Sequence, residues 1–410
     1  MRANLPFHLM AKPVGPLCNL RCRYCFYLEK EALFPPRTTR CMDDSTLEEF
    51  VRQYIESQPG TQVDFAWQGG EPTLLGVEYF RKAVDLQRRY ANGRTIRNAL
   101  QTNGTLLDDE WGAFLSDNDF LVGVSLDGPR ALHDRSRIDP HGRGSWTATM
   151  RGVAVLRRHK VEFNTLTCVS RANAGEPLEV YRFLLDAGAR HLQFIPVVER
   201  SPATAERERG LSLGAPSLAA SCTARATNWS IDGAGWGDFL IAIFDRWVRR
   251  DAGNVQVQQF DDALGRWLGL PGGVCVHSET CGRALAIEHD GSVYACDHYV
   301  YPEYRLGNVR ETGLPRLVDD PRQIAFGLAK RDRLPDRCRS CPVRFACHGG
   351  CPKHRFGTGP GGEPGSNHLC EGYRAFFTHV DPYMRLMATL YRRGQPPGLI
   401  RSILATSRRR

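Results

Sequence analysis

The chain lacks a long hydrophobic run. Although 42% of its 410 residues are hydrophobic, no segment approaches the roughly 20 consecutive apolar residues of a membrane-spanning helix. Its opening, MRANLPFHLMAKPVG, also lacks the apolar stretch and the small-residue cleavage site of a secretory signal. We therefore expect a cytoplasmic protein with no membrane partner.

Concentrated charge is also scarce. The formal net charge is +9, and the basic residues are spread along the chain instead of gathering with aromatic residues on one segment. A nucleic-acid-binding face needs such a concentration, so we expect no nucleic-acid partner. The mild positive charge would attract an acidic electron donor or an acidic stretch of a protein substrate.

Cysteine, in contrast, is abundant, with 14 residues. In a cytoplasmic chain so many cysteines indicate metal ligands and not disulfides. Three of them, Cys18, Cys22 and Cys25, have the spacing C-x3-C-x2-C. Three thiolates can hold three irons of a [4Fe–4S] cube and leave the fourth iron open for chemistry. Zinc would need a fourth ligand, and none lies close by; chance spacing is the other alternative.

The first half of the chain alternates between apolar β-rich runs and amphipathic helical runs. The expected strands are 7–12, 63–67, 96–101, 120–125, 161–168 and 191–196, and the expected helices are 45–57, 77–91, 108–117, 146–159 and 177–187. Asp44 and Ser45 mark the start of the first helix. Six β/α repeats predict an α/β fold with a partial (β/α)6 barrel, whose working residues lie at the carboxyl ends of the strands.

The pattern changes in the second half of the chain. Residues 200–235 are rich in Ser, Ala and Gly, a helical run follows, and short strands with Cys, Gly and Pro come after it. We expect four segments: a barrel over 5–235, a helical linker over 236–270, a cysteine-rich domain over 271–385 that ends in helices, and a basic tail over 386–410.

Eight more cysteines fall in this half, and their spacing alone does not separate zinc from iron–sulfur sites. The run Cys347-x3-Cys351-Pro352 is similar to a ferredoxin ending in which the last cysteine serves a different cluster. Eight thiolates would fully coordinate two [4Fe–4S] clusters. Of the remaining cysteines, Cys168 lies on an expected core strand and is interpreted as inert packing, while Cys41 and Cys222 receive no role.

The segment Cys18-x3-Cys22-x2-Cys25-Phe26 resembles the signature of the radical S-adenosylmethionine (SAM) enzymes. In that family the open iron chelates SAM, and one electron splits SAM into methionine and a 5′-deoxyadenosyl radical. The elements GGEP, QTNG, SLDGP and HDRSR follow strands in the family's order. The resemblance implies SAM contacts from these residues: Tyr24, Gly69, Gly70, Glu71, Ser125, Arg137 and Val198.

The later cysteines resemble the SPASM domain that follows radical SAM barrels. The resemblance implies two auxiliary [4Fe–4S] clusters, for three clusters in all. The first would be held by Cys275, Cys281, Cys296 and Cys351, and the second by Cys338, Cys341, Cys347 and Cys370. Fully ligated clusters cannot bind SAM, so they would act as structural anchors or electron relays.

Longer motifs narrow the resemblance to anaerobic sulfatase-maturating enzymes: KPVGPLCNLRCRYCFYLEK, GGEPTL, QTNGTLL, VSLDGP and CDHYVYPEYRLGN. This implies oxygen-independent oxidation of a Cys or Ser, in a sulfatase motif Cys/Ser-x-Pro/Ala-x-Arg, to Cα-formylglycine after hydrogen abstraction from Cβ. Asp297 matches the proposed base, although the residues alone also allow a turn-capping role. The implied partners are an unfolded sulfatase polypeptide and a flavodoxin- or ferredoxin-like electron donor.

Two other functions compete with this one. A SPASM enzyme that modifies a ribosomally made peptide would often carry an N-terminal recognition domain, whereas here the first expected strand begins near residue 7. A non-catalytic zinc or iron–sulfur scaffold would leave GGEP, Ser125 and Arg137 without a use.

Overall fold

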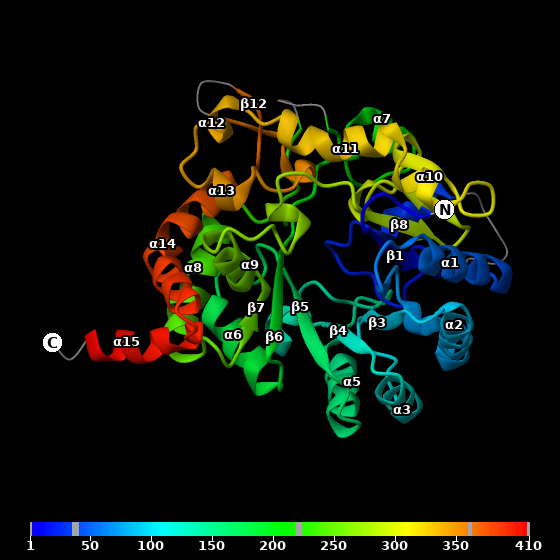
Figure 1. Ribbon diagram of the computed structural model, residues 1–410, viewed down its shortest axis with the longest axis horizontal. Coiled ribbons are helices and arrows are strands. Elements are labelled where there is room, and N and C mark those ends of the chain that lie inside the picture. Colours follow the sequence, from blue (N-terminus) through cyan, green and yellow to red (C-terminus); the bar gives the residue numbers. More distant parts are fainter. Residues whose placement is uncertain (1, 35–40, 219–223, 360–362, 408–410) are drawn as a thin grey trace.

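The computed structural model is built around a ten-stranded sheet, whose strand order is β10-β9-β8-β1-β2-β3-β4-β5-β6-β7. The structure describes residues 2–34, 41–218, 224–359 and 363–407. Strands β8 and β1 to β7 pair in parallel, and β9 and β10 complete one edge in antiparallel fashion. The parallel strands curve into a half-barrel with helices on its outside (Figure 1).

The six expected β/α repeats are confirmed, and their ends lie within two residues of the expected positions. The strands are β1 (His8–Lys12), β2 (Gln62–Trp67), β3 (Thr95–Thr102), β4 (Leu121–Ser125), β5 (Phe163–Val169) and β6 (His191–Pro196). The helices are α1 (Asp44–Ser57), α2 (Gly76–Tyr90), α3 (Asp109–Asp117), α4 (Arg130–His133), α5 (Trp146–Arg158) and α6 (Pro177–Asp186). The cap of α1 is Asp43, whose carboxylate accepts a hydrogen bond from the Thr46 amide, and not the expected Asp44.

The second half adds one strand at the β6 edge of the sheet, three strands at the β1 edge and a layer above the barrel. These elements are α7 (Thr204–Glu208), α8 (Gly233–Arg250), β7 (Gln256–Val257), α9 (Gln258–Trp267), β8 (Ala284–Glu288), β9 (Ser292–Tyr294), β10 (Arg305–Asn308), α10 (Leu314–Val318), α11 (Pro321–Asp332), α12 (Asp336–Arg339), α13 (Arg344–Cys347), β11 (Gly357–Thr358), β12 (Pro364–Ser366), α14 (Cys370–Arg392) and α15 (Ile400–Ser407). The cysteine-rich half is joined to the barrel because β8 pairs with β1 from His8↔Ala284 to Lys12↔Glu288.

Two expected boundaries differ from the structure. The segment expected as a linker forms α8 and α9, and both helices are built into the apolar core beside β6. The segment expected as a basic tail is helical over most of its described length, because α14 continues to Arg392 and Ile400 of α15 is fully buried. The final three arginines and Cys222 lie outside the described residues.

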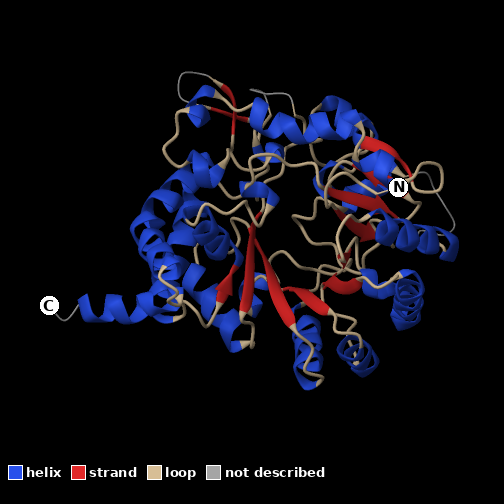
Figure 2. Cartoon of the chain, viewed as in Figure 1, coloured by secondary structure: helices blue, strands red, loops and turns tan. Residues whose placement is uncertain are grey.

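Two apolar cores separate the sheet from its outer helices. Alternation along the strands drives this arrangement: Val63, Phe65 and Trp67 of β2 are buried toward the helices, while Asp64 points to the other face. One core packs under α1, α2, α3 and α5, and the other joins β6 to α6, α8, α9 and α14. Loops lie on the concave side of the sheet (Figure 2). Among the described residues, no helix has the length and apolar character that crossing a bilayer requires.

Helix α14 lies unusually close to α8, and glycines make the contact. A Cβ on Gly372 would lie 2.0 Å from the carbonyl oxygen of Gly233 and 2.7 Å from the amide nitrogen of Gly237. Backbone therefore packs against backbone at the first turn of α14, directly after Cys370.

We expect Gly372→Ala to destabilise the fold, because the added methyl group can be accommodated only if the two helices separate. Overpacking of this kind costs about 1–3 kcal/mol, and thermal unfolding of the anaerobically purified protein should show a melting temperature lower by several degrees. Gly265→Ala on α9 is the matched control, since its Cβ would meet nothing within 4 Å. Equal melting temperatures for the two variants would contradict this account.

Candidate functional site

Polar side chains gather on the concave face at the carboxyl edge of the sheet. Lys12 is the last residue of β1, Gln68 follows β2, and Gln101 is near the end of β3. The Lys12 ammonium donates a hydrogen bond to Gln68 at 3.3 Å, and the Gln68 amide donates one to Gln101. Sequence reasoning missed this chain of contacts, although each residue is a polar position at the end of a buried strand.

The first cysteine loop follows β1 at this edge. Burial raises the pKa of Cys18 to about 12, and it also raises the pKa values of Cys22 and Cys25; neighbouring thiols of the loop add to the rise for Cys18 and Cys22. The Leu20 amide donates a hydrogen bond to the Cys18 sulfur at 3.3 Å. Three neighbouring buried thiols with amide donors fit an iron–sulfur cluster, because such thiols exchange their protons for metal.

Gly69 and Gly70 support this loop by close backbone packing. The Gly70 amide donates a hydrogen bond to the Gly15 carbonyl at 2.7 Å, and the Glu71 amide donates one to Leu17 at 2.9 Å. A Cβ on Gly70 would lie 1.9 Å from the Leu17 carbonyl oxygen. The cysteine loop therefore requires glycine at these two positions, and the sequence alone did not reveal this packing constraint.

The carboxylate of Glu71 ties two strand ends together. It accepts hydrogen bonds from the Thr73 amide and hydroxyl, from the Thr102 hydroxyl and from the Asn103 amide. Glu71 is 1% exposed, and burial raises its pKa despite these donors. The side chain therefore holds the GGEP and QTNG turns in place, and its backbone is the part that remains close to the cysteine loop.

Asp127 is the centre of the next group of contacts, and sequence reasoning missed it although it lies within SLDGP. Its carboxylate accepts a hydrogen bond from the Tyr24 hydroxyl at 2.5 Å and lies 3.0 Å from Nε of Arg137. The Arg137 guanidinium lies 5.6 Å from the centre of the Tyr24 ring. Arg137 and Tyr24 are both buried, so Asp127 orients the two side chains at the edge of the first cysteine loop.

Cys168 belongs to the same group, which corrects its interpretation as inert packing. Cys168 is partly exposed. Its sulfur accepts a hydrogen bond from the Arg137 guanidinium at 3.8 Å, and its backbone amide donates one to the Asp127 carboxylate at 2.9 Å. Alternation turns Cys168 to the concave face, because its neighbours Thr167 and Val169 are buried on the other side.

The last two expected SAM contacts are both buried. Ser125 is the final residue of β4, 7% exposed, and it pairs in register with Leu166. Val198 is 1% exposed and belongs to the core that includes Trp236 and Phe239. A contact of Val198 with adenine would therefore have to come through its backbone.

Four later cysteines form one neighbourhood: Cys275, Cys281, Cys296 and Cys351. Burial raises the pKa of Cys281 to about 12, and Cys275 and Cys351 add to this. The Lys330 ammonium lies beside them and donates hydrogen bonds to the carbonyls of Cys275, Val276 and Ser278. Cys351 thus joins this set and not the cysteines next to it in sequence.

The other four cysteines line a single cavity of about 250 Å³: Cys338, Cys341, Cys347 and Cys370. Arg355 lies between this set and the previous one, since Cys338, Cys347, Cys281 and Cys351 all act on its pKa, which burial lowers. In the part of the chain that the structure describes, no three His, Cys, Asp or Glu side chains converge as the ligands of one metal ion do.

Asp297 reaches the barrel from the cysteine-rich half. It directly follows Cys296, and one of its carboxylate oxygens lies 2.5 Å from the Lys12 ammonium. Burial favours the neutral carboxyl, but Lys12 and, more weakly, His298 outweigh burial and lower the pKa of Asp297. An ionised acceptor is therefore held at the end of β1, which leads directly into the first cysteine loop.

A second ion pair ties the two halves together beside Asp297. The Lys353 ammonium lies 2.5 Å from the Glu199 carboxylate, with both side chains 8% exposed. Lys353 also lies 4.8 Å from the centre of the Phe26 ring in the first cysteine loop. The segment after Cys351 is in this way fixed to the loop that follows Cys25.

The fold and its cysteine sites define a radical SAM protein with an auxiliary iron–sulfur domain. Residues 13–184 match the Radical SAM superfamily, and residues 275–342 match the SPASM iron-sulfur cluster-binding domain. The serine-type anaerobic sulfatase-maturating enzyme of Bacteroides thetaiotaomicron is 43% identical over 399 residues, with 97% of this chain and 95% of the relative covered. The chain belongs to the anaerobic sulfatase-maturating enzymes.

Two further matches broaden this family assignment. The cysteine-type enzyme of Clostridium perfringens is 32% identical, with 92% of this chain and 97% of the relative covered. The structure of native anSMEcpe with bound AdoMet and the Cp18Cys peptide superimposes with a TM-score of 0.80 at 31% identity, over 94% of this chain and 99% of that chain. Serine-type and cysteine-type relatives are thus both similar to this chain.

We expect Gly70→Ala to disrupt the first cysteine loop, because the added Cβ would overlap the carbonyl oxygen of Leu17. This oxygen is a backbone atom, so it cannot move aside as the end of a flexible side chain can. Iron bound at this loop should fall by at least half, measured by iron analysis and by electron paramagnetic resonance of a variant that keeps only Cys18, Cys22 and Cys25 as cluster ligands. Gly60→Ala is the control, since its Cβ would meet nothing within 4 Å. Full iron content in Gly70→Ala would show that the close packing is not needed.

Proposed function

We propose that this chain oxidises a Cys or Ser of a sulfatase polypeptide to Cα-formylglycine without oxygen. One observation carries the proposal: the pairing of β8 with β1 places the Asp297 carboxylate 2.5 Å from Lys12, at the strand end from which the first cysteine loop begins. A proton acceptor and the cysteine loop for SAM chemistry therefore face the same space. The relatives named for sulfatase maturation support the same reaction.

The cofactors that fit these residues are SAM and three [4Fe–4S] clusters. Cys18, Cys22 and Cys25 would hold the cluster with an open iron, and the two later sets of four cysteines would hold auxiliary clusters. The expected SAM contacts come from Tyr24, Gly69, Gly70, Glu71, Ser125, Arg137 and Val198. When bound, the reduced first cluster and SAM supply a 5′-deoxyadenosyl radical that removes a hydrogen atom from the substrate Cβ.

Asp297 completes the reaction as the base. Lys12 keeps the carboxylate ionised, so the side chain can accept the proton of the substrate thiol or hydroxyl once a radical at Cβ makes that proton more acidic. Cys296, directly before Asp297, would hold the first auxiliary cluster together with Cys275, Cys281 and Cys351, and that cluster would supply an acceptor for the second electron. Before this proton transfer, the Lys12 ammonium 2.5 Å away stabilises the ionised form of Asp297.

The partners follow from this chemistry. The target residue must reach the concave face of the half-barrel, so the substrate is an unfolded, extended segment of the sulfatase. A flavodoxin- or ferredoxin-like protein would supply the electron to the first cluster. We expect action in the reducing cytoplasm, where cysteines serve as metal ligands and not as disulfides. We expect no nucleic-acid or membrane partner.

The first test is an anaerobic assay of the reconstituted, reduced protein with SAM and a short peptide that carries Cys-x-Pro-x-Arg. We expect the peptide to lose about 18 Da, or about 2 Da for the serine version, with a matching amount of 5′-deoxyadenosine. Mass spectrometry and chromatography measure the two products. Deoxyadenosine without a change in either peptide would refute the sulfatase substrate and favour another peptide.

We expect Asp297→Asn to separate radical formation from oxidation. Loss of the base should lower formylglycine formation about 100-fold or more, while cleavage of SAM continues, because the first cysteine loop is unchanged. The assay compares deoxyadenosine with modified peptide for this variant and for Glu303→Gln, an exposed carboxylate a few residues away. Full formylglycine formation in Asp297→Asn would eliminate the base role.

A further inference from the structure

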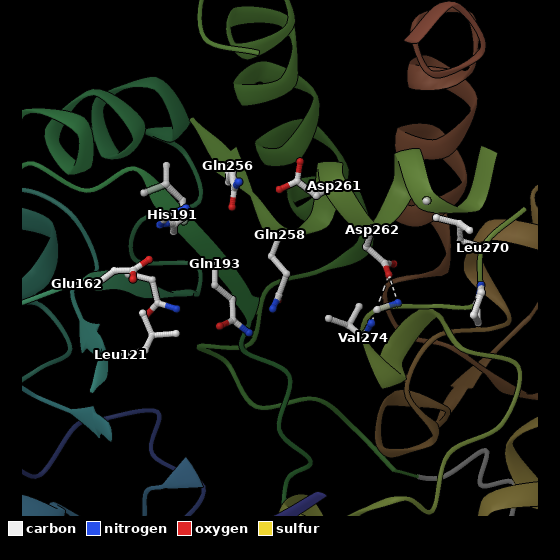
Figure 3. Close-up of a pocket in the computed structure, with 15 residues that line it drawn as sticks. Leu121, Glu162, His191, Gln193, Gln256, Gln258, Asp261, Asp262, Leu270 and Val274 are labelled. Atoms are coloured by element: carbon white, nitrogen blue, oxygen red, sulfur yellow. Dashed lines mark hydrogen bonds between the residues drawn. The ribbon is translucent and has the colours of Figure 1, made fainter. Parts of the chain in front are cut away.

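A cavity of about 590 Å³ lies at the opposite edge of the half-barrel from the first cysteine loop. Its strand-side wall consists of the beginnings of β4, β5, β6 and β7, and its other wall consists of α9 and the loop 270–274, which leads to Cys275. Figure 3 shows Glu162 on the strand-side wall and Asp261 on the helix side, with Gln193 and Gln258 between them. The cavity therefore lies at the amino edge of β4 to β7, away from the carboxyl edge at which Lys12 lies.

The lining of this cavity is acidic. It contains Glu162, Asp261 and Asp262 and neither a Lys nor an Arg. Asp262 is already engaged, because its carboxylate accepts hydrogen bonds from the Gly273 and Val274 amides and lies 3.2 Å from His277. The carboxylates of Glu162 and Asp261 have no hydrogen-bond or ion-pair partner within the part of the chain that the structure describes.

The environment of Asp261 favours an incoming cation. Water reaches the side chain, but the surrounding protein raises the pKa of Asp261 to about 6 by desolvation. The titratable groups that face it across the cavity are Glu162 and His191, and its neighbour on the helix, Arg266, donates instead to the carbonyls of Leu270 and His277. A positive group placed here would offset the cost of desolvation.

The depth of the half-barrel fits the spacing of the sulfatase motif. From Asn164, which lines the cavity, to Cys168 at the carboxyl edge is four residues of β5, or about 13 Å at the rise of a strand. An extended peptide covers about the same distance in four residues. With the oxidised residue in the space between Asp297, at the end of β1, and Cys168, at the end of β5, the arginine of Cys/Ser-x-Pro/Ala-x-Arg would reach the depth of the acidic cavity.

We propose that this cavity is the subsite for the arginine of the substrate motif, with Asp261 and Glu162 as the carboxylates that bind its guanidinium. The inference rests on the proposed function and assigns these two residues to substrate specificity. Gln193, Gln256 and Gln258 line the same cavity, and their amides supply donors and acceptors for the peptide backbone. The peptide then runs from the carboxyl edge of the strands to their amino edge.

The experiment compares two peptides that differ only in the motif arginine and its neutral isostere citrulline. For the unmodified enzyme we expect KM to rise about tenfold with citrulline, equivalent to about 1.4 kcal/mol, while kcat changes little. The double variant Glu162→Gln/Asp261→Asn should show the raised KM with both peptides. Asp238→Asn, an exposed carboxylate on α8, serves as the matched control and should keep the full preference for arginine.

Reversing the charge at Asp261 and on the peptide tests whether Asp261 itself binds the motif arginine. The variant Asp261→Lys should oxidise a peptide with glutamate in place of the arginine more efficiently than the arginine peptide. Equal KM values for arginine and citrulline peptides with the unmodified enzyme would overturn the subsite while the proposed function stands, because both peptides would still be oxidised. Oxidation of neither peptide would instead refute the proposed function.

The double variant should melt no lower than the parent at neutral pH, since it removes a carboxyl whose raised pKa opposes folding there.

Discussion

The parallel pairing of β8 with β1 is the contact on which the rest of the site depends. It extends the barrel sheet into the cysteine-rich half and fixes their register from His8↔Ala284 to Lys12↔Glu288. Backbone hydrogen bonds set the position of the turn after β9, and so bring Asp297 to Lys12. The Tyr27 hydroxyl, just after the first cysteine loop, also donates to Glu288 at the end of β8. A slip of one residue would turn Lys12 to the other face.

The molecule also buries several positively charged side chains. Lys12, Lys330, Lys353 and Arg355 are each less than 9% exposed, and each lies beside a carboxylate, a set of carbonyls or a group of cysteines. An isolated buried charge is costly, so these side chains are stable where negative charge is near. Thiolate ligands supply such charge, and positive neighbours in turn tune the potentials of iron–sulfur clusters.

The sequence predicted the repeats well because the apolar alternation of six strands and the periodicity of their helices are local signals. The resemblance to the SPASM domain implied the grouping of the later cysteines, including Cys351 with a set that is distant in sequence, and this grouping stays a prediction. Long-range pairing has no local signal, so β8 beside β1, the ion pair of Lys12 with Asp297 and the role of Asp127 could not be read from the chain. Glu71 and Val198 show the same limit, since a motif identifies a strand end but not the direction of a side chain.

The two later cysteine sets are interleaved along the chain, because Cys351 of one set lies between Cys347 and Cys370 of the other. During synthesis, the first set is complete only after residue 351 and the second only after residue 370, near the start of α14. Neither of the proposed auxiliary clusters could therefore be fully ligated before residue 351 is synthesised, so delivery to them would follow synthesis of the barrel strands β1 to β6. A chain that ends early would retain the first cysteine loop and its barrel strands without either complete auxiliary set.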